Sequence, residues 1–162
     1  MIGNRNTALS SRWFDNNKYK NSGRILANNA YNFLKNIANA HSDTCIWTAP
    51  LSATNKSGIE ITSFKGGFLS MNARATNEYQ NRNACAYLVN RFENPIIQTY
   101  FRQYGLEVNE DLFALSELVQ WLFRSAIRNG EPISLYIPSR RMRKLLEDWL
   151  NGRLMQNLKK AA

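Results

Sequence analysis

The order of hydrophobic and polar residues along the chain predicts several helices. Apolar residues recur every three or four positions, as expected of helices that bury one face. The segments with this period are 25–40, 85–92, 95–104, 110–129 and 140–150. Gly105 and Gly130 follow two of these segments, at the position where glycine commonly ends a helix.

Short apolar or alternating runs lie between these helices and predict strands. They are found at 44–48, 59–64, 68–71 and 133–137. The polar segments 50–58 and 72–82 are predicted loops. Helices that alternate with short buried strands indicate a layered α/β fold, with a short, partly parallel sheet flanked by helices.

The length of 162 residues suggests a single domain over 1–162. Residues 1–22 form an irregular or short helical N-terminal segment in this interpretation, and 153–162 form a basic tail. No apolar run reaches transmembrane length, and the N-terminus lacks the apolar core of a signal peptide. We therefore expect a cytoplasmic protein that does not enter a membrane.

Positive charge exceeds negative charge, with 21 Lys and Arg against 12 Asp and Glu and a net charge of +9. A surface of this sign attracts polyanions, because each neutralised phosphate releases a counterion. The charge excludes an acidic mimic of DNA. A basic protein without a nucleic-acid partner remains an alternative.

One candidate anion site is a set of polar residues in the predicted helix 110–129. Gln120, Arg124 and Arg128 are four residues apart, so they line up on one face of such a helix. Guanidinium groups on a buried helix need anions, which indicates a preformed phosphate site. The alternative is pairing inside the protein, with Glu110, Asp111 or Glu117.

A second candidate is the predicted loop 72–79 and the residue Arg82 beyond it. Loops that follow strands are where α/β folds place ligands. Arg74, Asn77 and Arg82 suit contacts with phosphates or a nucleic-acid backbone. The alternative is a turn capped by its asparagines, since asparagine favours such positions.

A third candidate is the start of the last predicted helix, where Arg140, Arg141 and Arg143 crowd the first turns. Positive charge at a helix N-terminus opposes the helix dipole and costs stability. Phosphate contacts would offset this cost, and a locally unfavourable pattern often indicates function. A solvated basic face is the alternative.

Four stretches resemble the C-terminal part of phage and plasmid superfamily-two-like helicases: FLSMNARATNEY, AYLVNRFENP, ALSELVQWLFRSAIRNGEPI and YIPSRRMRKLLEDWL. The resemblance implies a RecA-like C-terminal lobe. NARATNEY resembles motif five, which couples nucleotide state to the grip on nucleic acid. Gln120, Arg124 and Arg128 resemble motif six, whose arginines reach nucleotide phosphates. Here the two arginines are one residue further apart than in that motif.

The parts that such a motor needs for catalysis are absent from the sequence. It contains no G-x-x-x-x-G-K-[ST] loop and no acidic magnesium-binding motif. His41 is adjacent to Ser42 and Asp43, so these residues cannot form a triad across space. Cys45 and Cys85 with one histidine make no zinc set. We therefore expect no enzymatic activity and no cofactor.

Two functional hypotheses follow. The first is a non-catalytic nucleic-acid-binding protein from a phage or mobile element, with DNA favoured over RNA, that completes a separate motor chain in trans or acts alone. The second is an inhibitor or adaptor that binds a host protein, such as a nuclease or CRISPR effector. A fragment of a longer helicase is a third interpretation. The sequence favours no oligomeric state.

Overall fold

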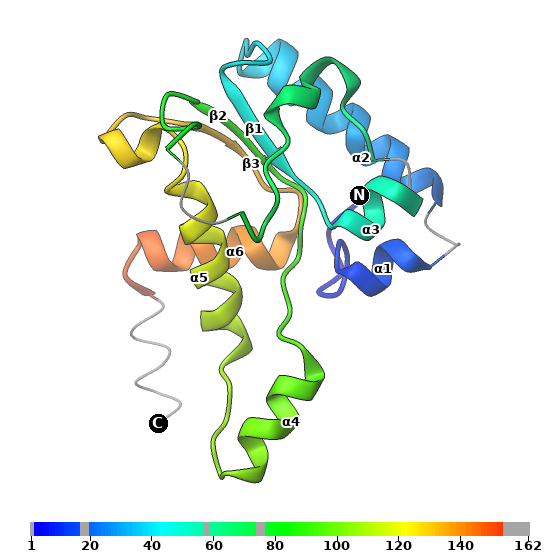
Figure 1. Cartoon of the computed structure of the whole chain (residues 1–162), viewed down its shortest axis with the longest axis vertical. Coiled ribbons are helices and arrows are strands. Elements are labelled where there is room, and N and C mark those ends of the chain that lie inside the picture. Colours follow the sequence, from blue (N-terminus) through cyan, green and yellow to red (C-terminus); the bar gives the residue numbers. More distant parts are fainter. Residues whose placement is uncertain (1, 17–19, 57–58, 74–76, 154–162) are drawn as a thin grey trace.

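A three-stranded parallel sheet lies at the centre of the computed structural model, and helices cover both of its faces (Figure 1). The structure describes residues 2–16, 20–56, 59–73 and 77–153. The strands, in their order across the sheet, are β1 (Cys45–Thr48), β2 (Ala84–Tyr87) and β3 (Ser134–Tyr136). This sheet confirms the predicted α/β fold class.

The described residues form six α-helices and three short helices of other types. The α-helices are α1 (Ser11–Asp15), α2 (Lys20–Asn32), α3 (Leu51–Lys56), α4 (Pro95–Gln103), α5 (Glu110–Leu122) and α6 (Arg140–Leu150). The others are the π-helix η2 (Phe33–Ile37) and the 3-10 helices η3 (Thr62–Gly67) and η4 (Ala126–Asn129). Of the expected helices, 95–104 and 140–150 are confirmed as α4 and α6. The expected helix 25–40 begins earlier, at Lys20, and ends earlier, at Ile37, where α2 continues into η2.

The strands separate two hydrophobic cores, because successive side chains point to opposite faces. Cys45 and Trp47 join the core beneath α2, whereas Ile46 joins the core beneath α5 and α6. All four residues of β1 and all four of β2 are buried. A parallel sheet covered on both faces has this burial pattern.

The sheet reverses its direction of growth beside β1. A parallel bridge pairs Phe68 with Trp47, on the edge of β1 that does not pair with β2. The chain therefore visits β1, then the Phe68 position on one side of it, then β2 on the other side. The crevice at the carboxyl ends of such strands is where open α/β sheets commonly bind ligands.

The expectation of a helix at 85–92 is wrong, because this segment contains β2. Ala84 pairs with Cys45 on one side and with Ser134 on the other. A strand buried on both faces shows no alternation of apolar and polar residues, so its apolar run also fits a helical period. The central strand of the sheet is therefore the element that the periodicity misassigned.

The predicted pattern between β1 and β2 is also wrong in three places. The expected loop 50–58 contains α3, and the expected strand 59–64 is replaced by η3 after an irregular turn. The expected strand 68–71 contributes only the bridge at Phe68. Buried apolar residues in this region fill the α2 core without strand pairing, and Trp47 Nε1 donates to the carbonyl of Phe64 at 2.8 Å.

The expected helix 110–129 ends at Leu122. Ser125 is buried in an extended conformation, with φ −88° and ψ −170°, and its hydroxyl donates to the carbonyl of Leu122 at 2.6 Å. The N–H of Ala126 then donates to the carbonyl of Arg82 at 2.9 Å. Serine hydroxyls compete with helical hydrogen bonds in this way. The chain therefore turns onto the segment that leads into β2.

Candidate functional site

The structure does not bring the predicted site residues together in one place. Because the strands are parallel, Arg82, which precedes β2, lies at the amino end of the sheet. Arg140 and Arg141 follow β3 and therefore lie at the carboxyl end. The predicted residues thus form two groups, and Arg74 lies outside the described residues.

The amino-end group joins two predicted elements that are far apart in sequence. Arg128 Nη1 donates to Asn77 Oδ1 at 2.5 Å, across 51 positions of the chain. Asn129 Nδ2 donates to the carbonyl of Gln80 at 3.0 Å. The loop that contains Asn77 and Gln80 therefore packs against η4.

The predicted stripe of Gln120, Arg124 and Arg128 is wrong as a helical feature. Gln120 is exposed on α5, whereas Arg124 lies in the turn after α5 and Arg128 lies in η4. The break at Ser125 removes the common helix face. The three residues keep their spacing in sequence but not the geometry that the spacing implied.

Arg124 is the unusual residue of this group. Its Nε and Nη1 atoms are buried, and neither has a hydrogen-bond partner among the described residues. Burying hydrogen-bond donors of a cation without partners costs free energy, because they lose water and gain nothing in exchange. An acceptor that reached either nitrogen would remove part of this cost.

Arg82, by contrast, is occupied by the protein. Its Nη1 donates to the carbonyls of Cys45 at 2.8 Å, Gly66 at 3.0 Å and Ser42 at 3.3 Å. The guanidinium also lies over the ring of Tyr79, 4.5 Å from its centroid. Arg82 therefore holds the loop before β2 against the start of β1, and these contacts give it a structural role.

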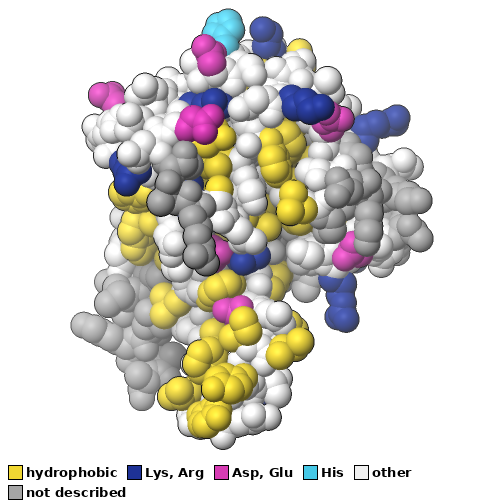
Figure 2. Space-filling view, in the orientation of Figure 1, with side chains coloured by type: hydrophobic (Ala, Val, Ile, Leu, Met, Phe, Trp, Pro, Cys, Tyr) yellow, Lys and Arg dark blue, Asp and Glu magenta, His cyan; other side chains and the backbone are white. Residues whose placement is uncertain are grey.

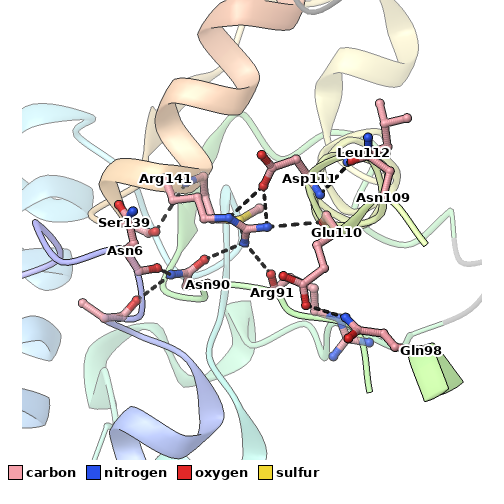
Figure 3. Close-up of polar contacts among 12 residues, drawn as sticks. Asn6, Asn90, Arg91, Gln98, Asn109, Glu110, Asp111, Leu112, Ser139 and Arg141 are labelled. Atoms are coloured by element: carbon pink, nitrogen blue, oxygen red, sulfur yellow. Dashed lines mark hydrogen bonds and ion pairs between the residues drawn. The ribbon is translucent and has the colours of Figure 1, made fainter. Parts of the chain in front are cut away.

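At the carboxyl end, Arg141 is committed to protein contacts rather than exposed (Figure 3). Its Nη1 donates to Asn90 Oδ1 at 3.1 Å and to the carbonyl of Arg91 at 2.7 Å. Its Nε and Nη2 reach Asp111 Oδ1 at 2.9 and 2.6 Å, and Nη2 also reaches the carbonyl of Glu110 at 3.3 Å. Arg141 thus ties α6 to the end of β2 and the start of α5.

The neighbours of Arg141 differ from it. Arg143 Nη1 donates to the carbonyl of Ile137 at 2.8 Å. Arg140 is exposed, and its backbone N–H donates to the carbonyl of Gly3 at 3.0 Å. Arg140 and Arg143 are both exposed, so their side chains are more open to an external anion than that of Arg141.

A cleft of about 650 Å³ lies at the carboxyl end, where the sheet reverses its direction of growth. Its walls come from the N-terminal segment, the end of β2 and the start of α4. The lining residues include Thr7, Ser10, Arg12, Asn90, Arg91 and Pro95. Periodicity missed Asn90 and Arg91, because it placed them in a helix. A strand assignment for 84–89 would have put both at a ligand-binding edge.

Both thiols are buried in the fold. Burial raises the pKa of Cys45 to about 11 and that of Cys85 to about 12, although a hydrogen bond with Ser125 acts in the opposite direction on Cys85. Within the described ranges, no group of three or more His, Cys, Asp or Glu residues could hold a metal ion. No described helix is long and apolar enough to cross a membrane.

Comparison with known proteins places these features in a family. The family described as "YonV C-terminal Rossmann-like domain" matches residues 1–150. The chain is 46% identical over 151 residues to the "SPbeta prophage-derived uncharacterized protein YonV" of Bacillus subtilis (strain 168). The match covers 93% of this chain but 36% of the relative, so the chain spans about a third of that protein's length. No solved structure matches.

The family description and the parallel sheet agree on a Rossmann-like fold, and the relative supports the expected phage connection. Neither match names a helicase, so the more specific resemblance to a RecA-like helicase lobe stays a prediction. Both matches extend over more than nine tenths of the chain, and both carry the name YonV. The chain belongs to the YonV C-terminal Rossmann-like domain family.

Proposed function

We propose that this domain is a non-catalytic nucleic-acid-binding module of a phage or mobile element, and that it binds phosphates at the amino end of its sheet. The prophage origin of the relative supports the assignment to a mobile element. The net charge of +9 supports a polyanionic partner. The missing nucleotide-binding loop supports a role without ATP hydrolysis.

The observation that carries the proposal is that the buried Nε and Nη1 of Arg124 have no hydrogen-bond partner among the described residues. A phosphate oxygen that accepts from either nitrogen would form a charge-assisted hydrogen bond, which is stronger than one between neutral groups. Arg128 follows in η4 and is oriented by Asn77. Arg128 therefore adds an exposed second cation to the same segment of the chain, and the fold already holds it in place.

The test measures binding of labelled single-stranded and double-stranded DNA, and of RNA, by fluorescence anisotropy over a range of salt concentrations. Binding should weaken with salt, and Arg124→Gln should weaken it while lowering the slope against log salt by about one. The matched control is Arg102→Gln, which removes the same charge from an exposed position on α4. Flat isotherms at low salt, or equal losses in both variants, would overturn the proposal.

A second readout distinguishes a ligand-binding arginine from a structural one. Because two nitrogens of Arg124 lack partners in the fold, Arg124→Met should leave the unfolding temperature unchanged or raise it while binding falls. A large drop in stability together with unchanged binding would show that Arg124 serves the fold instead.

The alternative, an inhibitor or adaptor that binds a host protein such as a nuclease or CRISPR effector, stays a prediction. Pull-downs with and without nuclease treatment separate the two functions. A specific host protein that is retained after nuclease treatment, combined with absent nucleic-acid binding, would favour the alternative.

A further inference from the structure

The helix α4 projects from the rest of the domain at the far end of an extended arm (Figure 1). The arm, residues 92–109, leaves the carboxyl end of β2 and returns at the start of α5. No residue of α4 is buried. A side-chain contact to the body is the hydrogen bond from Gln98 Nε2 to Glu110 Oε1, at 2.5 Å.

The sequence nevertheless specifies this helix carefully. Asn94 caps it by accepting from the N–H of Ile96 at 2.9 Å, and Pro95 occupies the first turn, where no donor is needed. Gly105 follows the helix with a positive φ of 71°. The arm is therefore a defined element with start and stop signals, although its helix buries no residue.

The exposed face of the arm is strongly apolar. Ile96 is 76% exposed and Tyr104 is 67% exposed. The other large exposed apolar residues of the arm are Ile97, Tyr100, Phe101 and Leu106. Figure 2 shows hydrophobic side chains gathered over this part of the molecule. An exposed apolar patch of this kind marks an interaction surface, and a nine-residue helix is marginal in water without packing.

The family comparison supplies a candidate for what covers the arm. The chain matches the C-terminal domain of YonV and spans 36% of that protein, so most of YonV precedes the matching domain. The N-terminal segment of this chain lies at the base of the arm, since Thr7 and Ser10 line the same cleft as Asn94 and Pro95. A preceding region would therefore enter the domain beside the arm.

We propose that the arm docks into an apolar groove of the region that precedes this domain in the longer family proteins, such as YonV. The anchors are the side chains of Ile96, Tyr100 and Tyr104. The centroids of the two tyrosine rings lie 5.1 Å apart, and the rings form one contiguous apolar surface. This inference does not depend on nucleic-acid binding, because the arm and Arg124 lie at opposite ends of the sheet.

The test compares amide hydrogen exchange in this chain and in full-length YonV. In this chain, α4 should exchange rapidly, because its amides are protected only by local helical hydrogen bonds. In YonV, the aligned segment should exchange at least about a hundredfold more slowly, as expected for a packed helix. The segment aligned with α6 should be slow in both proteins and provides the internal control. Equally rapid exchange of the arm in both proteins would overturn the proposal.

A variant of full-length YonV sharpens this comparison. Lysine at the two positions aligned with Ile96 and Tyr100 should restore rapid exchange in the arm and leave α6 protected. Lysine at the position aligned with Leu51, which is 60% exposed on α3, is the matched control and should change nothing in the arm. A different outcome is slow exchange of the arm in this chain by itself, which becomes slower as the protein concentration rises. This result would identify a second copy as the occupant and refute the proposed docking.

Discussion

Replacing Arg141 with alanine tests whether this arginine is a structural clamp, as its contacts indicate, or a phosphate ligand, as its place in the sequence suggested. The side chain is 12% exposed and bonds to the amide of Asn90 and the carbonyls of Arg91 and Glu110. The variant removes these contacts together with the ion pair to Asp111.

The magnitude follows from what each contact leaves behind. Asn90 is 2% exposed, so its amide oxygen and the nearby carbonyl of Arg91 lose a charged donor in a place where water does not easily replace it. Each such loss costs about 1–3 kcal/mol. The pair with Asp111 adds little, because Asp111 is 58% exposed. We expect Arg141→Ala to lower the free energy of unfolding by about 3–4 kcal/mol, which corresponds to a fall in Tm of about 10 °C.

Urea denaturation followed by tryptophan fluorescence measures this change, and the m-value should stay constant if both variants unfold in two states. The matched control is Arg140→Ala, which removes an exposed side chain next to it and should change the free energy of unfolding by less than about 0.5 kcal/mol. If Arg141→Ala unfolds within about 1 kcal/mol of the unmodified protein, the clamp is not stabilising and the reasoning from its contacts fails.

Two further predictions concern the backbone and the thiols. Gly3→Ala should destabilise the fold far more than Gly130→Ala, measured by thermal unfolding, because both have positive φ but a Cβ at Gly3 would lie 2.1 Å from the carbonyl oxygen of Pro138; equal losses would mean that the N-terminal segment yields freely. Cys45 and Cys85 should resist iodoacetamide at pH 8 until urea unfolds the chain, since a pKa of about 11 leaves Cys45 about one part in a thousand ionised. Rapid labelling of the native protein at pH 8 would contradict this protection. Both pKa values lie above the ordinary 9.0, so the thiols of the unfolded chain ionise first, and the free energy of unfolding should decline as pH rises from about 9 toward 11.

The sequence predicted the layered α/β class and the outer helices, because those elements depend on local signals. α6 begins at its serine cap and follows an amphipathic period, and α4 lies between Asn94 and Gly105. β2 could not be recognised in this way. It is buried on both faces by long-range pairing, so its residues carry no periodicity that distinguishes a strand from a helix.

The candidate site was predictable in part, for a similar reason. The sequence singled out Arg124 and Arg128, but the chain after the break at Ser125 is held by a hydrogen bond from Ala126 to the carbonyl of Arg82, more than forty positions earlier. The number of internal contacts that Arg141 makes could not be foreseen, because its partners come from separate segments. Basic residues that look equivalent along the chain therefore differ in role according to what the fold places beside them.

The contacts of the N-terminal segment have a consequence for the order of folding. Asn90 binds the carbonyls of Asn6 and Ala8 through its side chain, and Gly3 accepts from the N–H of Arg140. Residues 3–8 are thus held by parts of the chain that a ribosome makes much later. Closing such long loops is slow, so these residues should join the domain last, after α6 has formed. Until then the carboxyl edge of the nascent sheet stays uncovered, and this interval is when chaperones or misfolding compete with completion of the domain.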